Sequence, residues 1–219
     1  MLGSVLVGRE GPLPGRTDLI KLHHSPLSRS VRILWLLEEL GIPFELVSAP
    51  LEDPEAGPFV QKTPWGKFPA IEDGETVMFE SGAILEYLIE RYGEGRLAPA
   101  SDAPNRGAYL QWIHFAESTA FPGLGNIAWH TRVRKDADEM PAAIEDYRGW
   151  AEAAVATVEG ALEGHVFILG EAFSGADIML GYTLMIAKAF GALTTEHPRS
   201  DAYLARLLER PGFRAALRS

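Results

Sequence analysis

The sequence contains no cysteine among its 219 residues. This absence excludes disulfides, thiolate metal sites and any redox cycle that uses a thiol of the protein itself. No stretch approaches the roughly 18 uninterrupted apolar residues of a membrane-spanning helix, and the opening MLGSVLVG lacks the basic start and the length of a secretion signal. We therefore expect a cytoplasmic protein that has no membrane partner.

Positive charge is also scarce. The chain has 20 Lys and Arg against 30 Asp and Glu, for a net charge of −10. An acidic surface repels the phosphates of nucleic acids, so we expect no nucleic-acid partner. The six histidines show no spacing typical of a metal site, and we expect no metal. Hydrophobic residues make up 47% of the chain, which is ample material for a core.

The pattern of the chain changes after about ninety residues. The first part alternates β-prone runs with helical periodicity and includes a hairpin signal at Asp73-Gly74. After the linker-like GEGRLAPASDAP the strand signals vanish, and only helical stretches follow, expected at 105–121, 141–162, 176–189, 200–210 and from 212 onward. We predict a flexible extension over 1–16, a small α/β domain over 17–93, a linker over 94–103 and an all-helical domain over 104–219.

Two serines stand just before the first long helix, in SPLS. A strand that runs into SPLS and then a helix matches the place where thioredoxin-like proteins carry C-P-x-C. There the helix N-terminus favours an anion, so a serine hydroxyl can hydrogen-bond a thiolate that another molecule supplies. Serine is also a good helix cap. We favour the chemical role for Ser25 and the capping role for Ser28.

Three later motifs extend this pattern. In WGKFPAI, Pro69 indicates either a cis turn that exposes backbone groups to an extended peptide or a plain strand start. In ESGAI, Glu80 and Ser81 offer a carboxylate, a hydroxyl and free helix N–H groups, or simply a helix start capped by Ser81. SGADIML is a capping box with a folding role.

Taken in order, these motifs resemble the cytosolic glutathione S-transferases. The segments that carry the resemblance are SPLSRSVRILWLLEELGIPFE, TPWGKFPAIEDGETVMFESGAILEYLIERY, SGADIML and YLARLLERPGFRAAL, which together span about Leu19 to Leu217. The first helix is most similar to a bacterial and fungal subgroup. The resemblance implies a thioredoxin-like N-terminal domain, an all-helical C-terminal domain, glutathione as co-substrate, an electrophilic small molecule as partner and a homodimer.

The resemblance also implies roles for single residues. Ser25 would hydrogen-bond the glutathione sulfur, or Ser28 if the register is taken from the helix end. Phe68 would offer its backbone to the cysteinyl part, with Pro69 cis, while Glu80 and Ser81 would hold the γ-glutamyl end. The loop from Pro50 to Gln61 lacks the basic residue that many relatives place near the glycyl carboxylate. Either Lys62 or Lys67 substitutes for it, or glutathione binds less tightly.

The aromatic residues of the helical domain are candidates for the wall of an electrophile pocket, and each also fits core packing: Tyr109, Trp112, Phe115 and Trp129. The leading hypothesis is a transferase that activates the glutathione thiol for attack on a small hydrophobic electrophile. Two alternatives stay open at this point. One is another glutathione-dependent enzyme, such as an isomerase, a peroxidase or an ether-cleaving enzyme, and the other is a non-catalytic transferase-like module.

Overall fold

The structure is a computed structural model that describes residues 4–7, 19–50 and 66–219. The chain forms two compact units, Met1–Gly95 with Glu209–Ser219, and Arg96–Leu208. The C-terminal segment thus belongs to the first unit, whereas the sequence suggested the helical domain. The reason is local packing: Phe213 stacks on Trp35 with ring centroids 4.0 Å apart, and Arg210 forms a two-pronged ion pair with Glu39.

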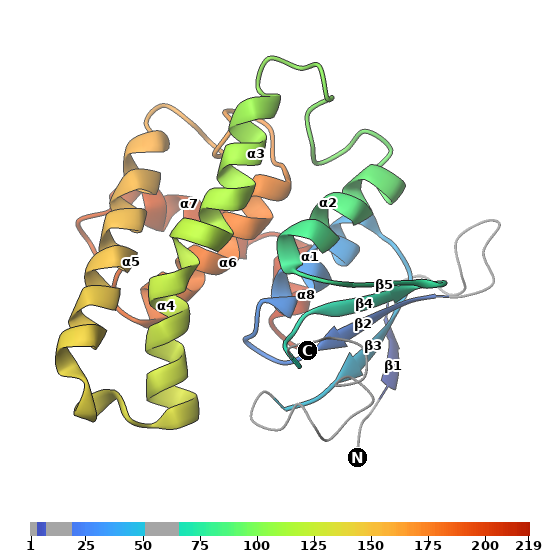
Figure 1. Cartoon of the computed structure of the whole chain (residues 1–219). Coiled ribbons are helices and arrows are strands. Elements are labelled where there is room, and N and C mark those ends of the chain that lie inside the picture. Colours follow the sequence, from blue (N-terminus) through green and yellow to red (C-terminus); the bar gives the residue numbers. More distant parts are fainter. Residues whose placement is uncertain (1–3, 8–18, 51–65) are drawn as a thin grey trace. The chain divides into compact units, whose positions relative to one another are not determined.

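The first unit is built on a five-stranded sheet in the order β1-β3-β2-β4-β5 (Figure 1). Strands β2 and β3 are parallel, and the other neighbours are antiparallel. The bounds are β1 Ser4–Val7, β2 Ile20–His24, β3 Phe44–Ser48, β4 Ala70–Asp73 and β5 Thr76–Phe79. The expected hairpin is therefore formed by β4 and β5, with Gly74 at φ 63° in the turn.

The expectation of a flexible extension over residues 1–16 is wrong for β1. Ser4 to Val7 pair with Val47 to Phe44 along the outer side of β3. Without β1, the outer backbone of β3 would have no strand partner, and an open edge of this kind favours recruitment of a β-prone segment. The rest of the predicted extension lies outside the described residues.

Three helices accompany the sheet in this unit: α1 Ser30–Leu40, α2 Ser81–Tyr92 and α8 Pro211–Ala216. Helix α1 is buried along most of its length and packs against both α2 and α8. It ends at Gly41, whose φ of 68° is the left-handed conformation that glycine adopts most readily.

The second unit is entirely helical within residues 96–208, as predicted. Its elements are α3 Arg106–His114, η2 Phe115–Thr119, α4 Phe121–Ala128, η3 Trp129–Arg134, η4 Ala137–Glu139, α5 Pro141–Ala161, α6 Gly175–Ala189 and α7 Pro198–Leu208. Helical structure therefore runs on beyond 121, where the sequence indicated an end at a Pro- and Gly-containing stretch. Pro122 lies in the first turn of α4, where proline is tolerated.

The capping box predicted at the start of α6 is confirmed. Ser174 is the N-cap, and the reciprocal bonds between Ser174 and Asp177 are both present. Asp177 is fully buried and also accepts hydrogen bonds from the Ile168 N–H at 2.9 Å and the Tyr203 hydroxyl at 2.7 Å. In the parts of the chain that the structure describes, no helix combines the length and the hydropathy needed to cross a bilayer.

Candidate active site

A pocket of about 300 Å³ opens in the α/β unit at the edge where β4 begins and α2 starts. Five of its lining residues are ones that the sequence predicted for ligand binding, and two were missed: the full lining is Arg29, Lys67, Phe68, Pro69, Phe79, Glu80 and Ser81. The β4–β5 hairpin separates the KFP and ES motifs in the sequence and brings both to the lining of one pocket.

The KFP part of the pocket has the geometry that the resemblance implies. The peptide between Phe68 and Pro69 is cis. Phe68 is buried, whereas Lys67 beside it is exposed at the pocket. The turn therefore presents backbone at the pocket, with a cation next to it.

The ES part differs from the expectation in one respect. Ser81 was expected to cap α2, but Glu80 is the N-cap residue, with φ 71° and an exposed side chain, and Ser81 is the first helical residue. The Ser81 hydroxyl instead accepts a hydrogen bond of 2.9 Å from Nη1 of Arg32, which is fully buried in α1. A guanidinium thus lies directly behind the N-terminus of α2. The sequence feature that could have pointed to Arg32 is a charged residue among the apolar residues in the first half of α1.

The serine corner lies between β2 and α1, and neither Ser25 nor Ser28 is among the residues that line the pocket. The Ser28 hydroxyl accepts the Ser30 N–H at 3.2 Å and lies 2.6 Å from the Ser30 hydroxyl. The N-cap residue of α1 is Arg29, not Ser28 as expected, so Ser28 lies one residue before the cap, although its hydroxyl accepts from the first helical N–H. The Ser25 hydroxyl is buried and has no hydrogen-bond partner among the described residues. The two serines thus differ in their hydrogen bonds: the Ser28 hydroxyl has partners within the chain, and the Ser25 hydroxyl has none among the described residues.

His24 and Ser30 complete this corner, and the sequence analysis missed both. Ser30 Oγ lies 2.8 Å from Nδ1 of His24. His24 is fully buried, and burial lowers the pKa of its imidazole from 6.5 to about 4, against the opposing effect of a hydrogen bond with the Ser219 backbone. His24 is therefore neutral near pH 7. The HH dipeptide was visible in the sequence, but no spacing rule marked it.

The aromatic candidates of the helical unit fall into two groups. Tyr109 and Trp112 are buried inside the unit, which is typical of core residues. Phe115 is half-buried and meets the Trp112 ring edge-on, with centroids 5.1 Å apart. Trp129 is 47% exposed. Of these four candidates, only Phe115 and Trp129 offer ring surface to a ligand.

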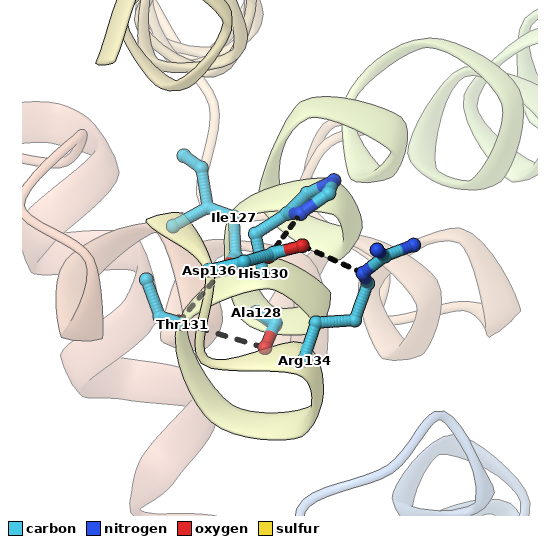
Figure 2. A network of polar contacts seen from close by, with 6 residues as sticks. All are labelled: Ile127, Ala128, His130, Thr131, Arg134 and Asp136. Carbon is cyan, nitrogen blue, oxygen red and sulfur yellow. Dashed lines mark hydrogen bonds and ion pairs between the residues drawn. The ribbon is translucent and has the colours of Figure 1, made fainter. Parts of the chain in front are cut away.

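The stretch after Trp129 contains a network of polar contacts around His130, Arg134 and Asp136 (Figure 2). Asp136 accepts a hydrogen bond from Arg134 Nε at 2.7 Å and lies 2.7 Å from His130 Nδ1. The bond to His130, with a further contribution from Arg134, lowers the pKa of the Asp136 carboxyl. The network lies at the C-terminal end of η3, where Lys135 is the C-cap residue and adopts the left-handed conformation with φ 59°.

Comparison with known proteins identifies the family. The family model "Glutathione S-transferase, N-terminal domain" matches residues 19–96, and the model "Glutathione S-transferase, C-terminal domain" matches residues 141–206. The glutathione S-transferase-like protein OpS6 of Beauveria bassiana is 33% identical over 205 residues, covering 88% of this chain and 91% of the relative. The chain belongs to the glutathione S-transferase family.

Solved structures agree with this assignment. A glutathione transferase from Methylococcus capsulatus superposes with a TM-score of 0.82 at 28% identity, covering 91% of this chain and 98% of that one. A glutathione transferase family member from Pseudomonas fluorescens, solved with two glutathione molecules bound, gives a TM-score of 0.81 at 26% identity and covers 93% and 95%. The protein is therefore a glutathione transferase with a thioredoxin-like first unit and a helical second unit, and the N-terminal match contains both the pocket and the serine corner.

Proposed function

We propose that this glutathione transferase binds glutathione in the pocket of its α/β unit and activates the thiol through the hydroxyl of Ser25. The observation that carries the proposal is the buried Ser25 Oγ, which has no hydrogen-bond partner among the described residues. Buried polar groups are nearly always satisfied, so an unsatisfied one at a strand-to-helix turn calls for a ligand atom. A glutathione sulfur is an acceptor that such a hydroxyl can serve.

The charges around the pocket support glutathione as the co-substrate. Near pH 7 glutathione carries one ammonium and two carboxylates. The pocket lining contains two cations, Arg29 and Lys67, and one anion, Glu80. We propose that Glu80 and Ser81 hold the γ-glutamyl end, that the Phe68 backbone next to Pro69 holds the cysteinyl part, and that Arg29 and Lys67 share the two carboxylates. Arg29 then takes part in the role for which the sequence suggested only Lys62 or Lys67. Lys62 lies outside the described residues.

The Ser25 hydroxyl and the N-terminus of α1 can supply the free energy needed to lower the pKa of the glutathione thiol. A free thiol with a pKa near ~8.5 is only a few per cent ionised at neutral pH. Lowering that pKa by about two units needs ~2.7 kcal/mol of preferential thiolate stabilisation. A hydroxyl donating to a charged acceptor contributes roughly 1.5–3 kcal/mol, and a helix N-terminus adds about 0.3–1 kcal/mol. Ser25 and the start of α1 together supply the required amount.

In the reaction, the thiol proton leaves to solvent as the Ser25 hydroxyl donates a hydrogen bond to the sulfur. The thiolate then attacks the electrophilic carbon of the second substrate. The new carbon–sulfur bond forms as the leaving group departs with its electron pair. Among the aromatic candidates of the helical unit, Phe115 and Trp129 keep exposed ring surface for a small hydrophobic molecule, whereas Tyr109 and Trp112 are buried.

A pair of serine variants tests the proposal. We expect Ser25→Ala to lower kcat/KM for conjugation of an aryl halide roughly 10- to 100-fold, because one charge-assisted hydrogen bond is lost. Ser28→Ala is the matched control, with an expected loss of about threefold or less, because the bonds that it removes join Ser28 to Ser30 and none of them reaches the sulfur in this proposal. Retention of the wild-type protein on immobilised glutathione checks binding separately. Full activity of Ser25→Ala, or a larger loss in Ser28→Ala, would contradict the assignment of Ser25.

We also propose a homodimer that acts in the cytoplasm. Members of the family that the sequence resembles are typically homodimers. The absence of cysteine fits a reducing compartment. Light scattering coupled to size-exclusion chromatography measures the mass directly. A mass of one 24.0 kDa chain at micromolar concentration would contradict the dimer.

A further inference from the structure

A chain of polar groups, buried except for Ser219 at its far end, lies behind the serine corner, and its centre is the hydroxyl of Ser30. Ser30 Oγ lies 2.8 Å from His24 Nδ1 and 2.6 Å from Ser28 Oγ, and it accepts the Ser25 N–H at 3.2 Å. On its far side, His24 Nε2 lies 3.4 Å from Ser219 Oγ. All of these groups belong to the α/β unit. Each serine hydroxyl has a single proton to donate, so the direction of the bonds can be worked out.

The far end of the chain sets the first direction. The Ser219 hydroxyl donates its proton to the carbonyl of Ala216 at 2.9 Å. Its oxygen can then only accept from His24, which places the ring proton on Nε2. The imidazole is neutral near pH 7, because burial lowers its pKa to about 4. A neutral ring carries one N–H, so Nδ1 holds a lone pair.

The near end follows from this. Nδ1 of His24 must accept, so the Ser30 hydroxyl donates to it. Ser30 Oγ then has lone pairs for two donors, the Ser25 N–H and the Ser28 hydroxyl. The Ser25 carbonyl, 3.1 Å from Ser30 Oγ, already accepts the Ser28 N–H at 3.1 Å and does not need the hydroxyl proton. The only proton of Ser28 is therefore committed to Ser30, and the proton of Ser25 is not committed.

We propose that His24 and Ser30 are positioning residues, and that the directed chain Ser28→Ser30→His24→Ser219 commits the Ser28 proton and holds the Ser25 peptide in place. Ser25 is then the one hydroxyl of the pair that can donate to the glutathione sulfur. The role of the chain rests on the proposed function above. With the opposite tautomer, the Ser30 proton would go to Ser28 Oγ or to the Ser25 carbonyl, and the Ser28 hydroxyl would no longer be committed to Ser30. The position of one proton on His24 thus decides whether Ser25 alone, or both serines, can donate to the sulfur.

The tautomer is measured directly by ¹⁵N NMR of the histidine side chains in the full-length wild-type protein, with His24→Asn to identify the His24 signals. We expect a neutral ring with its proton on Nε2 and an unprotonated Nδ1, both without and with glutathione. A proton on Nδ1 in either state would overturn the directed chain. This result does not depend on whether the protein conjugates anything.

Kinetics test what the chain does. We expect Ser30→Ala to lower kcat roughly tenfold while KM for glutathione changes less than about twofold, because the pocket residues stay in place and only the serine corner loosens. The pH profile of kcat/KM should shift to a higher apparent pKa, and Ser30→Thr, which keeps the hydroxyl, should recover most of both effects. Ser200→Ala removes a buried serine from the helical unit and is the matched control, with wild-type kinetics expected.

The outcomes separate the two proposals. Unchanged kcat and pH profile in a folded Ser30→Ala variant would overturn the positioning role. Equal losses in Ser30→Ala and Ser30→Thr would do the same, because the hydroxyl would then not be the group that matters. Failure of the wild-type protein to bind immobilised glutathione would instead overturn the proposed function, while the NMR result would still decide the direction of the chain.

Discussion

Two buried polar side chains, one in each unit of this transferase, differ in the hydrogen bonds that they form. In the helical unit, the carboxylate of Asp177 is fully buried and accepts hydrogen bonds from four donors of its own unit: Ser174 N–H, Ser174 Oγ–H, Ile168 N–H and Tyr203 Oη–H. In the α/β unit, the equally buried Ser25 Oγ has no partner among the described residues. The donors around Asp177 all come from the chain and stabilise the fold, whereas the Ser25 hydroxyl is uncommitted at the turn where we propose that glutathione binds.

The pKa values of the helical unit fit this division. Burial raises the pKa of the Asp177 carboxyl, and the hydrogen bonds from Ile168, Tyr203 and Ser174 oppose that increase. Burial and the neighbouring carboxylate together raise the pKa of Tyr203 well above its usual value, so its hydroxyl stays a donor. The network is a structural one that holds the start of α6 against α7.

The largest effect that the comparison predicts is on Asp177. We expect Asp177→Ala to lower the free energy of unfolding by roughly 3–4 kcal/mol, because four buried donors lose their acceptor at once. Urea denaturation followed by circular dichroism measures this. Asp177→Asn, which keeps an acceptor oxygen, should lose less. A loss of unfolding free energy below about 1 kcal/mol in Asp177→Ala would contradict the structural role of the Asp177 network.

The second effect concerns His24 and pH. Its pKa is about 4 in the folded protein against 6.5 as the reference value. The unfolded chain therefore binds a proton first as the pH falls, and stability declines between about pH 6.5 and 4 by up to ~3 kcal/mol. His24→Asn should remove this decline, so the difference between the two stability curves across that window is the measurement. Parallel curves would show that His24 titrates normally.

A third effect concerns the contact between α4 and α5. A Cβ on Gly123 would lie 2.5 Å from the carbonyl oxygen of Tyr147, so we expect Gly123→Ala to destabilise the helical unit by about 1–3 kcal/mol. Gly160 lies within α5 with no atom near its Cβ direction, and Gly160→Ala should instead stabilise by about 0.5–1 kcal/mol. Thermal unfolding of both variants gives the comparison. The same sign for both would contradict the close approach.

The smallest effect is on the stability of Ser25→Ala. Because the Ser25 hydroxyl has no partner among the described residues, its removal should change the free energy of unfolding by less than about 0.5 kcal/mol in the absence of glutathione. The same variant should lose only the part of the stabilisation by glutathione that comes from the bond to the sulfur, measured as a smaller shift in Tm at saturating ligand than in the wild type. A large loss of stability without ligand would show that Ser25 is a structural serine.

Much of the fold was predictable from local patterns. Helix α1 was marked by its apolar spacing and by Gly41 and Pro43 at its end, the β4–β5 hairpin by Asp73-Gly74, and α6 by its capping box. In each case the signal lies within a few residues of the element that it specifies. The elements that were missed depend on distant partners: β1 forms because β3 offers it an edge, and α4 tolerates Gly123 because α5 lies against it.

The site divides in the same way. The sequence alone determined the family resemblance, the absence of a thiol and the motifs that carry Ser25, Phe68 and Glu80, because these are properties of residue types in order. The sequence assigned no role to Arg29, Ser30 or His24, and only the tertiary structure placed them at the pocket and at the serine corner. The sequence favoured Ser25 over Ser28 for the sulfur but offered no contact to support that choice, which stays a proposal. The choice rests on which hydroxyl finds a partner in the folded chain, and hydrogen bonds between residues on different elements exist only once those elements have packed.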